Sequence, residues 1–342
     1  MPDARYELSP AVSARIGLRY AAPMQIDFVK CHGSGNDFPL IDARGGAVAE
    51  HDWPAIARAL ADRAGPVGGD GLLLLTAGDG EHAFGMRMFN SDGSEAETCL
   101  NGLRCVARAG FERLGLDAAN VQLKTSEATV ARDPDLAPGV VTIRETAGPA
   151  TRDVIAWPLH GAGAEIVEAP IAMLGGDRAF TAIAIPNPHL IAFVETVDEA
   201  ELVAIGTLCE AAPGWLPNRA NVSFVEVRET GLFVRTFERG VGLTNSCGSA
   251  MAASTYAACL TGRAAFGREI AVFNRGGLVR AQAEADGMVR LSGNATVEWA
   301  GTITVDPATA TARDLVVTAR SDDEQAAWSA AVEALCGPAV VG

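Results

Sequence analysis

The chain has 342 residues, and the 49% that are hydrophobic are spread along its length, so it can form two packed domains. Its 27 basic and 42 acidic residues give a formal charge of −15, which argues against nucleic acid as a partner and against binding to an anionic membrane surface. No apolar run has the length of a membrane-spanning helix and no signal-peptide pattern is evident, so we expect a cytoplasmic protein.

In chain order, the first predicted strand is MQIDFVKCHG, so residues 1–23 are interpreted as an N-terminal extension. The segment GNDFPLID then places Asn36 before a second apolar strand. Further on, an Arg-x-Phe strand at residues 87–89 is followed, ten residues after its Phe, by Cys99. An Asn-Gly turn and a helix-favouring run come next. This order predicts strands and turns that lead to a helix beginning at Cys99.

The second half of the chain repeats this order. PNPHLIAF places Asn187 before an apolar strand, 151 residues after Asn36, and VRTFERGVGLTNSC ends at Cys247, again ten residues after a Phe. Asp70 and Asn221, which each lie 34 residues after the corresponding asparagine, extend the match. A duplicated α+β unit is therefore predicted, with a central helix that begins at a cysteine in each copy.

The predicted organisation places the first unit at residues 24–150 and the second at residues 151–297. The boundary falls in a polar stretch that contains ETAGPATRD. Residues 307–342 are interpreted as a C-terminal extension with one amphipathic helix.

That helix is predicted in SDDEQAAWSAAVEALCGP. Ser321 and Glu324 have the spacing of a capping box at its start. Trp328, Val332 and Leu335 are expected to share one apolar face, and Gly337-Pro338 to end the helix. Its expected role is to cover an apolar patch of the domains.

Seven cysteines in a chain without a signal peptide are expected to be free thiols. Cys99 and Cys247 differ from the others because each begins a predicted helix. There the positive end of the helix dipole favours the thiolate form. The repeat predicts that these two cysteines face each other across a shared cleft. The remaining ones are interpreted as packing residues: Cys31, Cys105, Cys209, Cys259 and Cys336.

Two opposed helix N-termini can hold a carboxylate between their backbone N–H groups. The groups available here belong to Leu100, Asn101 and Gly102 on one side and to Gly248 and Ser249 on the other. The two sulfurs would flank the carbon next to that carboxylate, so that one thiolate removes a proton from one face while the opposite thiol supplies one to the other. This is racemisation or epimerisation without a cofactor. No metal-binding motif is found, and two lysines leave few attachment points for pyridoxal phosphate.

These segments resemble the diaminopimelate epimerase family. FVKCHGSGNDF is similar to that family's GxGNDF motif, FNSDGSEAETCLNGLRC to its first catalytic-cysteine motif, PNPHL to its GNPH motif, and FERGVGLTNSCGS to its ERGxGxTxxCGS motif. The resemblance covers roughly residues 24–306. It implies two pseudo-symmetric α/β domains, each a β-barrel-like sheet around a central helix, with the active site in the cleft between them. It also implies a strand near residues 298–306 that returns to the first domain.

By this resemblance the chain converts LL-diaminopimelate to the meso form, a step in the biosynthesis of lysine and peptidoglycan precursors, and needs neither a metal nor an organic cofactor. Cys99 and Cys247 are the implied base and acid. The implied substrate-binding residues are Asn36, His189 and Glu238 around the reacting amino acid, Asn90, Asn187, Asn221 and Arg239 at the far end, and Asn101, Gly102, Gly248 and Ser249 around the carboxylate. The amino acid substrate is the one expected partner, and the sequence leaves a homodimer open.

The sequence departs from the family pattern at Leu100, where the family usually has Gly, and at Leu243, where it usually has Glu. These departures keep open a cofactor-independent racemase of another amino acid, such as histidine or O-ureidoserine. Two other classes were considered: a thiol hydrolase with Cys99 as nucleophile and His189 as base, and an inactive paralogue that binds its ligand without turnover.

Overall fold

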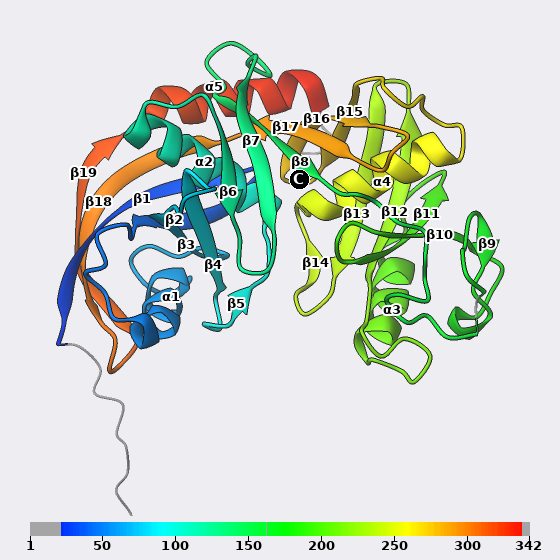
Figure 1. Ribbon diagram of the computed structural model, residues 1–342, viewed down its shortest axis with the longest axis horizontal. Coiled ribbons are helices and arrows are strands. Elements are labelled where there is room, and N and C mark those ends of the chain that lie inside the picture. The colour runs from blue at the N-terminus through cyan, green and yellow to red at the C-terminus, as the bar shows by residue number, and fades with distance from the viewer. Residues whose placement is uncertain (1–21, 162, 337–342) are drawn as a thin grey trace, which may run out of the picture.

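The computed structural model describes residues 22–161 and 163–336, which form two lobes side by side (Figure 1). Within these residues the strands of both lobes join in one 19-stranded sheet. The sheet curves around two central helices, α2 (Leu100–Leu114) and α4 (Gly248–Leu260). The expected mixed α/β fold class is confirmed.

The first lobe contains two helices and most of the early strands. Its strands are β1 (Met24–Gly33), β2 (Asn36–Asp42), β3 (Gly71–Ala77), β4 (Phe84–Asn90), β5 (Glu95–Ala96), β6 (Ala118–Gln122), β7 (Glu127–Asp133) and β8 (Thr142–Ala147), and its helices are α1 (Trp53–Ala61) and α2, with a 3-10 turn at Glu50–Asp52. Helix α2 follows Cys99, as predicted, and ends at Gly115, whose φ of 68° is a left-handed conformation that glycine adopts readily. Leu103, Val106 and Phe111 of α2 are buried inside the curved sheet.

The second lobe contains α3, α4 and the next strands. Its strands are β9 (Ala169–Pro170), β10 (Ala179–Ala184), β11 (Pro188–Val194), β12 (Asn221–Arg228), β13 (Gly231–Glu238), β14 (Gly242–Thr244), β15 (Ile270–Asn274) and β16 (Gly277–Ala283), with a 3-10 turn at Ala172–Leu174 and helix α3 (Glu199–Glu210). Asp198 caps α3 by accepting from the N–H groups of Ala200 and Glu201. Helix α4 is rich in small residues and buried along nearly its whole length, so the sheet approaches it closely.

The same order of strand pairings occurs in both lobes. In the first, β2 is parallel to β3, β3 antiparallel to β4, and β4 parallel to β6. In the second, β11 is parallel to β12, β12 antiparallel to β13, and β13 parallel to β15. The repeat found in the sequence is therefore a repeat of three-dimensional structure. The two units join where β17 (Val289–Asn294) pairs antiparallel with β8.

The last strands return to the first lobe. β18 (Thr296–Asp306) pairs antiparallel with β1, with Met24 opposite Val305. β19 (Thr311–Arg320), a strand that the sequence did not predict, continues this sheet beyond β18. Helix α5 (Asp322–Cys336) then lies across the upper side of the view in Figure 1. No helix of the described ranges is long and apolar enough to cross a membrane.

Helix α5 is confirmed, but two details of its prediction are wrong. The capping box does not form: the Ser321 N–H donates to the Glu298 carbonyl at 2.9 Å, and the Glu324 carboxylate binds Arg108 at 2.6 and 2.8 Å instead. Leu335 is 45% exposed and lies outside the apolar face, whereas Trp328 is buried. The predicted stop at residues 337–338 lies outside the described residues.

Candidate active site

A pocket of about 840 Å³ lies between the N-termini of α2 and α4. Both lobes line it, and nine of the thirteen predicted site residues are among its lining residues: Asn36, Asn90, Cys99, Asn101, Asn187, Glu238, Cys247, Gly248 and Ser249. The other four, Gly102, His189, Asn221 and Arg239, do not line it. The structure thus brings the two cysteines of the repeat to one pocket.

Cys99 directly precedes the first turn of α2. Its backbone is extended, and its sulfur accepts a hydrogen bond from the Gly102 N–H at 3.4 Å. The Gly102 amide, predicted to bind a carboxylate, is therefore already bonded to the thiol. The Cys99 thiol also donates to Asn36 Oδ1 at 3.8 Å.

Cys247 occupies the matching position before α4 and has different neighbours. Its sulfur lies 3.5 Å from the Ser249 hydroxyl. The charge of the nearby Glu238 carboxylate raises the pKa of the Cys247 thiol. Glu238 accepts a hydrogen bond from the Thr244 hydroxyl. Burial raises the pKa of Glu238, while this hydrogen bond acts in the opposite direction. Cys247 therefore has a carboxylate beside it that can accept its proton.

The amides at the two helix starts lower the pKa values of the thiols, as expected, but burial acts more strongly in the opposite direction. Burial raises the pKa of Cys99 to about 12, although the hydrogen bond from the Gly102 amide lowers it. Burial, followed by the charge of Glu238, raises the pKa of Cys247 well above its ordinary value. Loss of water around the sulfurs outweighs the nearby amides, so both cysteines are neutral thiols.

Asn36 connects Cys99 to a charged cluster that the sequence did not identify as part of the site. The Asn36 amide donates to the Asp70 carboxylate, and Arg63 binds that carboxylate at 2.7 Å. Asp70 and Arg63 line the pocket together with Arg58. The available sequence signal was the equivalence of Asp70 with Asn221 in the repeat.

His189 does not line the pocket and lies against Asn187, which does, and Asn221, which does not. Its Nε2 atom is 3.1 Å from Asn187 Oδ1 and 3.4 Å from Asn221 Nδ2, and the ring is fully buried. Burial lowers the pKa of His189 to about 3, so the imidazole is neutral. This placement, away from Cys99, does not support a thiol hydrolase that uses His189 as its base.

Arg239 is directed away from the pocket. Its backbone N–H donates to Asn221 Oδ1 at 2.9 Å, while its guanidinium donates to the Asn218 carbonyl at 3.1 Å. The side chain lines a separate, smaller cavity beside Trp157 and Pro188. Arg239 therefore does not line the pocket that contains the two cysteines, and its contact with the far end of a substrate stays a prediction.

Sequence comparison agrees with this geometry. The family model for diaminopimelate epimerase matches residues 28–134 and 181–298, which are more than half of the chain. The chain belongs to the diaminopimelate epimerase family. Each matched segment contains one of the two cysteine loops, so the family match coincides with both halves of the structural repeat.

Curated members of the family are similar over most of the chain. The diaminopimelate epimerase of Clostridium acetobutylicum is 39% identical over 290 residues, which are 83% of this chain and 87% of that protein. The enzyme of Geobacillus kaustophilus is 36% identical over 277 residues, with 80% and 95% covered. That of Synechococcus elongatus is 37% identical over 286 residues, with 82% and 99% covered.

Solved structures share the fold at low sequence identity. A hydroxyproline epimerase from Agrobacterium vitis, with bound trans-4-hydroxy-L-proline, has a TM-score of 0.60 at 15% identity over 90% of this chain and 98% of that chain. A phenazine biosynthesis protein of the PhzF family from Bacillus anthracis has a TM-score of 0.58 at 14% identity, with 82% and 99% covered. The two-domain epimerase fold is therefore shared beyond the diaminopimelate epimerase family.

The departure of this chain from the family pattern at Leu100 has a structural counterpart. The Leu100 side chain is buried and packs against Gly248 of the opposite cysteine loop, where an added Cβ would lie 2.7 Å from Leu100 Cβ. Leu100 thus fills space between the N-termini of α2 and α4. Because both residues line the pocket, this contact also shapes its floor.

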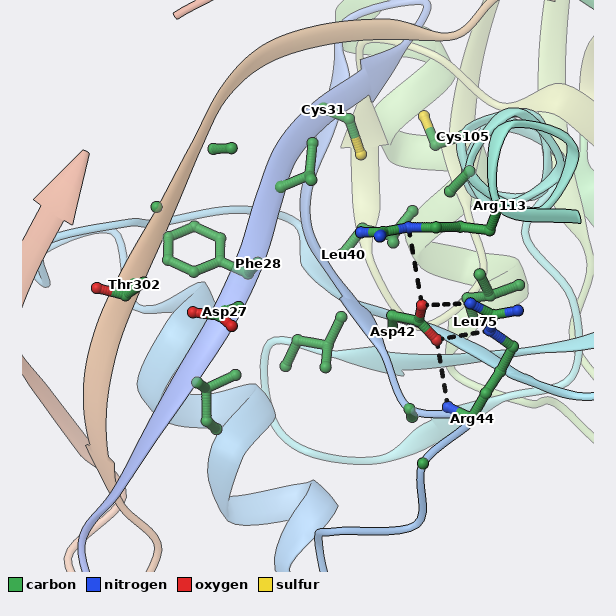
Figure 2. A pocket seen from close by; sticks show the side chains of 18 of the residues that line it. Asp27, Phe28, Cys31, Leu40, Asp42, Arg44, Leu75, Cys105, Arg113 and Thr302 are labelled. Carbon is green, nitrogen blue, oxygen red and sulfur yellow. Dashed lines mark hydrogen bonds and ion pairs between the residues drawn. The ribbon is translucent and has the colours of Figure 1, made fainter. Parts of the chain in front are cut away.

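A second cavity, of about 920 Å³, lies between β1, β2, α2 and β18 and contains none of the thirteen predicted site residues (Figure 2). Cys31 and Cys105 lie close together in its wall, and the neighbouring Cys105 thiol, with burial, raises the pKa of Cys31 well above its ordinary value. Asp42 is held near the opening by Arg44, with contacts of 2.8 and 2.7 Å. Size alone therefore does not identify the active site of this family member.

Proposed function

We propose that this protein epimerises LL-diaminopimelate to meso-diaminopimelate by proton transfer at one Cα, without a cofactor. The observation that carries the proposal is the pair of cysteines at matching helix starts, which line one pocket in a member of the diaminopimelate epimerase family. The curated relatives that bear this name support the choice of substrate.

In the proposed reaction, the α-carboxylate binds between the two helix N-termini, near the backbone N–H groups of Asn101, Gly248 and Ser249. This places Cα between the two sulfurs. One thiolate takes the Cα proton, the negative charge moves onto the carboxylate, and the opposite thiol delivers a proton to the other face. The direction of reaction decides which cysteine is the base.

One of the two thiols must lose its proton for turnover, because burial keeps both neutral. Glu238 lies near Cys247 and is the acceptor that we assign to this step. The substrate carboxylate is then bound and water is excluded from the site. The chemical step is the proton transfer between sulfur and carbon.

The far end of the pocket supports a substrate with two amino acid groups. Asn90 and Asn187 line it, as do the charged side chains Arg58, Arg63 and Asp70. A second carboxylate and a second ammonium group, as in diaminopimelate, match donors and acceptors of this kind. An amino acid with one charged end would leave them without a ligand partner.

The decisive experiment is deuterium incorporation at Cα in D₂O, measured by mass spectrometry across a panel of amino acids. We expect exchange with LL- and meso-diaminopimelate and none with histidine or O-ureidoserine. Exchange confined to another amino acid would contradict the proposal and favour the racemase alternative. Tight binding of diaminopimelate without exchange would indicate an inactive paralogue.

We also propose that the protein forms a homodimer. β19 pairs with β18 on one side, and among the described strands no partner covers its outer edge, where Val316 and Val317 are 56% and 38% exposed, so a second copy can pair there. Light scattering coupled to size-exclusion chromatography tests this, and a monomeric mass at micromolar concentration would contradict it.

A further inference from the structure

A buried chain of hydrogen bonds runs from the first-lobe sheet toward the second cysteine loop. It starts at Glu145 on β8 and Arg104 on α2, two fully buried side chains whose Oε1 and Nη1 atoms are 2.7 Å apart. Arg104 Nη2 also donates to Asn101 Oδ1 at 2.8 Å and to Ser34 Oγ at 3.1 Å. One guanidinium thus binds β8, the first turn of α2 and the β1–β2 turn together.

The chain then crosses to the second lobe. Asn101 Nδ2 donates to Ser246 Oγ at 3.0 Å, and Ser246 directly precedes Cys247. Asn274 at the end of β15 donates to the same oxygen at 3.0 Å. Because Asn101 Oδ1 accepts from Arg104 while its Nδ2 donates to Ser246, both ends of this amide are held.

We propose that Arg104, supported by Glu145, is a positioning residue that holds the two cysteine loops in register through Asn101 and Ser246. Arg104 does not line the active-site pocket, so it acts through these neighbours. A displacement of about 1 Å at a reacting group can lower a rate about 10²-fold, which makes the register of the loops important. The kinetic part of this inference rests on the proposed function; the geometric part does not.

Two variants disrupt opposite ends of the chain. Arg104→Lys keeps a positive charge opposite Glu145. Burial raises the pKa of Glu145 to about 7, and Arg104 acts in the opposite direction. The single ammonium group of lysine cannot donate to both Glu145 and Asn101 as the guanidinium does. Ser246→Ala removes the hydroxyl that joins the lobes. Ser254→Ala is the matched control, because Ser254 is buried on α4 and its Oγ has no hydrogen-bond partner within the described residues.

The first measurement needs no substrate. The full-length proteins are equilibrated with reduced and oxidised glutathione; as the Cys99 and Cys247 thiols form a disulfide, one glutathione disulfide is reduced to two glutathiones. We expect the equilibrium constant for this disulfide, quantified by mass spectrometry, to fall about tenfold in Arg104→Lys and Ser246→Ala and to stay unchanged in Ser254→Ala. An unchanged constant in both variants overturns the proposal, as does a wild-type protein that forms no such disulfide.

The second measurement is steady-state kinetics with diaminopimelate. We expect kcat to fall about 10- to 100-fold in both variants while KM stays within about threefold. A kcat within about twofold of the control contradicts the proposal. If the wild-type protein does not turn over diaminopimelate, the proposed function fails and the disulfide equilibrium still decides whether Arg104 positions the loops. If Arg104→Lys does not fold, Ser246→Ala decides both measurements.

Discussion

The two cysteine loops share a backbone plan and differ in their surroundings. Cys99 and Cys247 each precede a central helix and lie near the N–H group three residues further on. Cys99 has the neutral amide of Asn36 beside it, whereas Cys247 has the Glu238 carboxylate. The duplication therefore kept the scaffold for a pair of thiols and gave one of them a proton acceptor.

The supporting residues behind the two loops differ in the opposite sense. In the first half, Asn36 is bonded to Asp70, which pairs with Arg63. In the second half, Asn187 is the equivalent of Asn36 and Asn221 is the equivalent of Asp70, and both lie against the neutral imidazole of His189. In the second half the charged group, Glu238, is beside the thiol, whereas in the first half Asn36 lies between the thiol and the charged Asp70. The two sides of the pocket therefore differ chemically although the fold is pseudo-symmetric.

The largest effect is expected from loss of either thiol. Cys99→Ala and Cys247→Ala should each lower kcat about 10³-fold or more, because each removes the acid or base on one face. Cα–H exchange and epimerisation would both be measured. Cys259→Ala, a buried cysteine on α4 outside the pocket, is the control and should keep its activity. Full exchange in Cys247→Ala would show that the second half contributes no chemistry.

Glu238→Gln tests the carboxylate that distinguishes the two loops. We expect kcat/KM to fall about 10²-fold, since the acceptor for the Cys247 proton is lost. Burial raises the pKa of Glu238 above that of an ordinary glutamate. As the pH falls through this raised pKa, Glu238 becomes protonated and can no longer accept a proton, so the activity of the wild type should fall. The variant should lack this acid limb. Identical acid limbs in the two pH profiles would assign the proton acceptor elsewhere.

Gly248→Ala tests the contact between the loops. The new methyl group would lie 2.7 Å from Leu100 Cβ, so overpacking should lower the free energy of unfolding by about 1–3 kcal/mol. Adding Leu100→Gly removes the opposing side chain, and the pair should be less destabilised than the sum of the single variants by about 1 kcal/mol. Urea unfolding of the four proteins measures this coupling. Strict additivity would mean that the loops relax independently.

The smallest effect is expected from metal removal. Dialysis against a chelator should leave kcat unchanged, because the proposed chemistry uses two thiols and a carboxylate. If activity is lost on dialysis and restored by a divalent metal, the two-thiol mechanism is contradicted, and a metal site between the two cysteines is indicated.

Much of the fold was predictable from the sequence because its signals are local and occur twice. An Arg-x-Phe strand followed by a cysteine and a helix-forming run fixes the start of α2, and its repetition at Cys247 predicts the second central helix. β19 was missed because its pattern does not separate buried from exposed positions: all ten of its residues are partly or fully exposed.

The site was less predictable where burial decides the chemistry. The position of a thiol at a helix N-terminus is visible in the sequence, but the burial that raises the pKa of Cys99 depends on the folded chain around it. Arg104 is likewise one charged residue among many on a helix until the fold places Glu145, Asn101 and Ser34 around it. Long-range contacts of this kind have no periodic signal in the chain.

The pairing of β17 with β8 has a mechanical consequence. Because six successive residue pairs join the two units, from Val289 opposite Ala147 to Asn294 opposite Thr142, a sheet rather than a flexible linker connects the lobes. A change in the angle between the lobes would therefore have to bend or twist this shared sheet, because no free linker is there to rotate about.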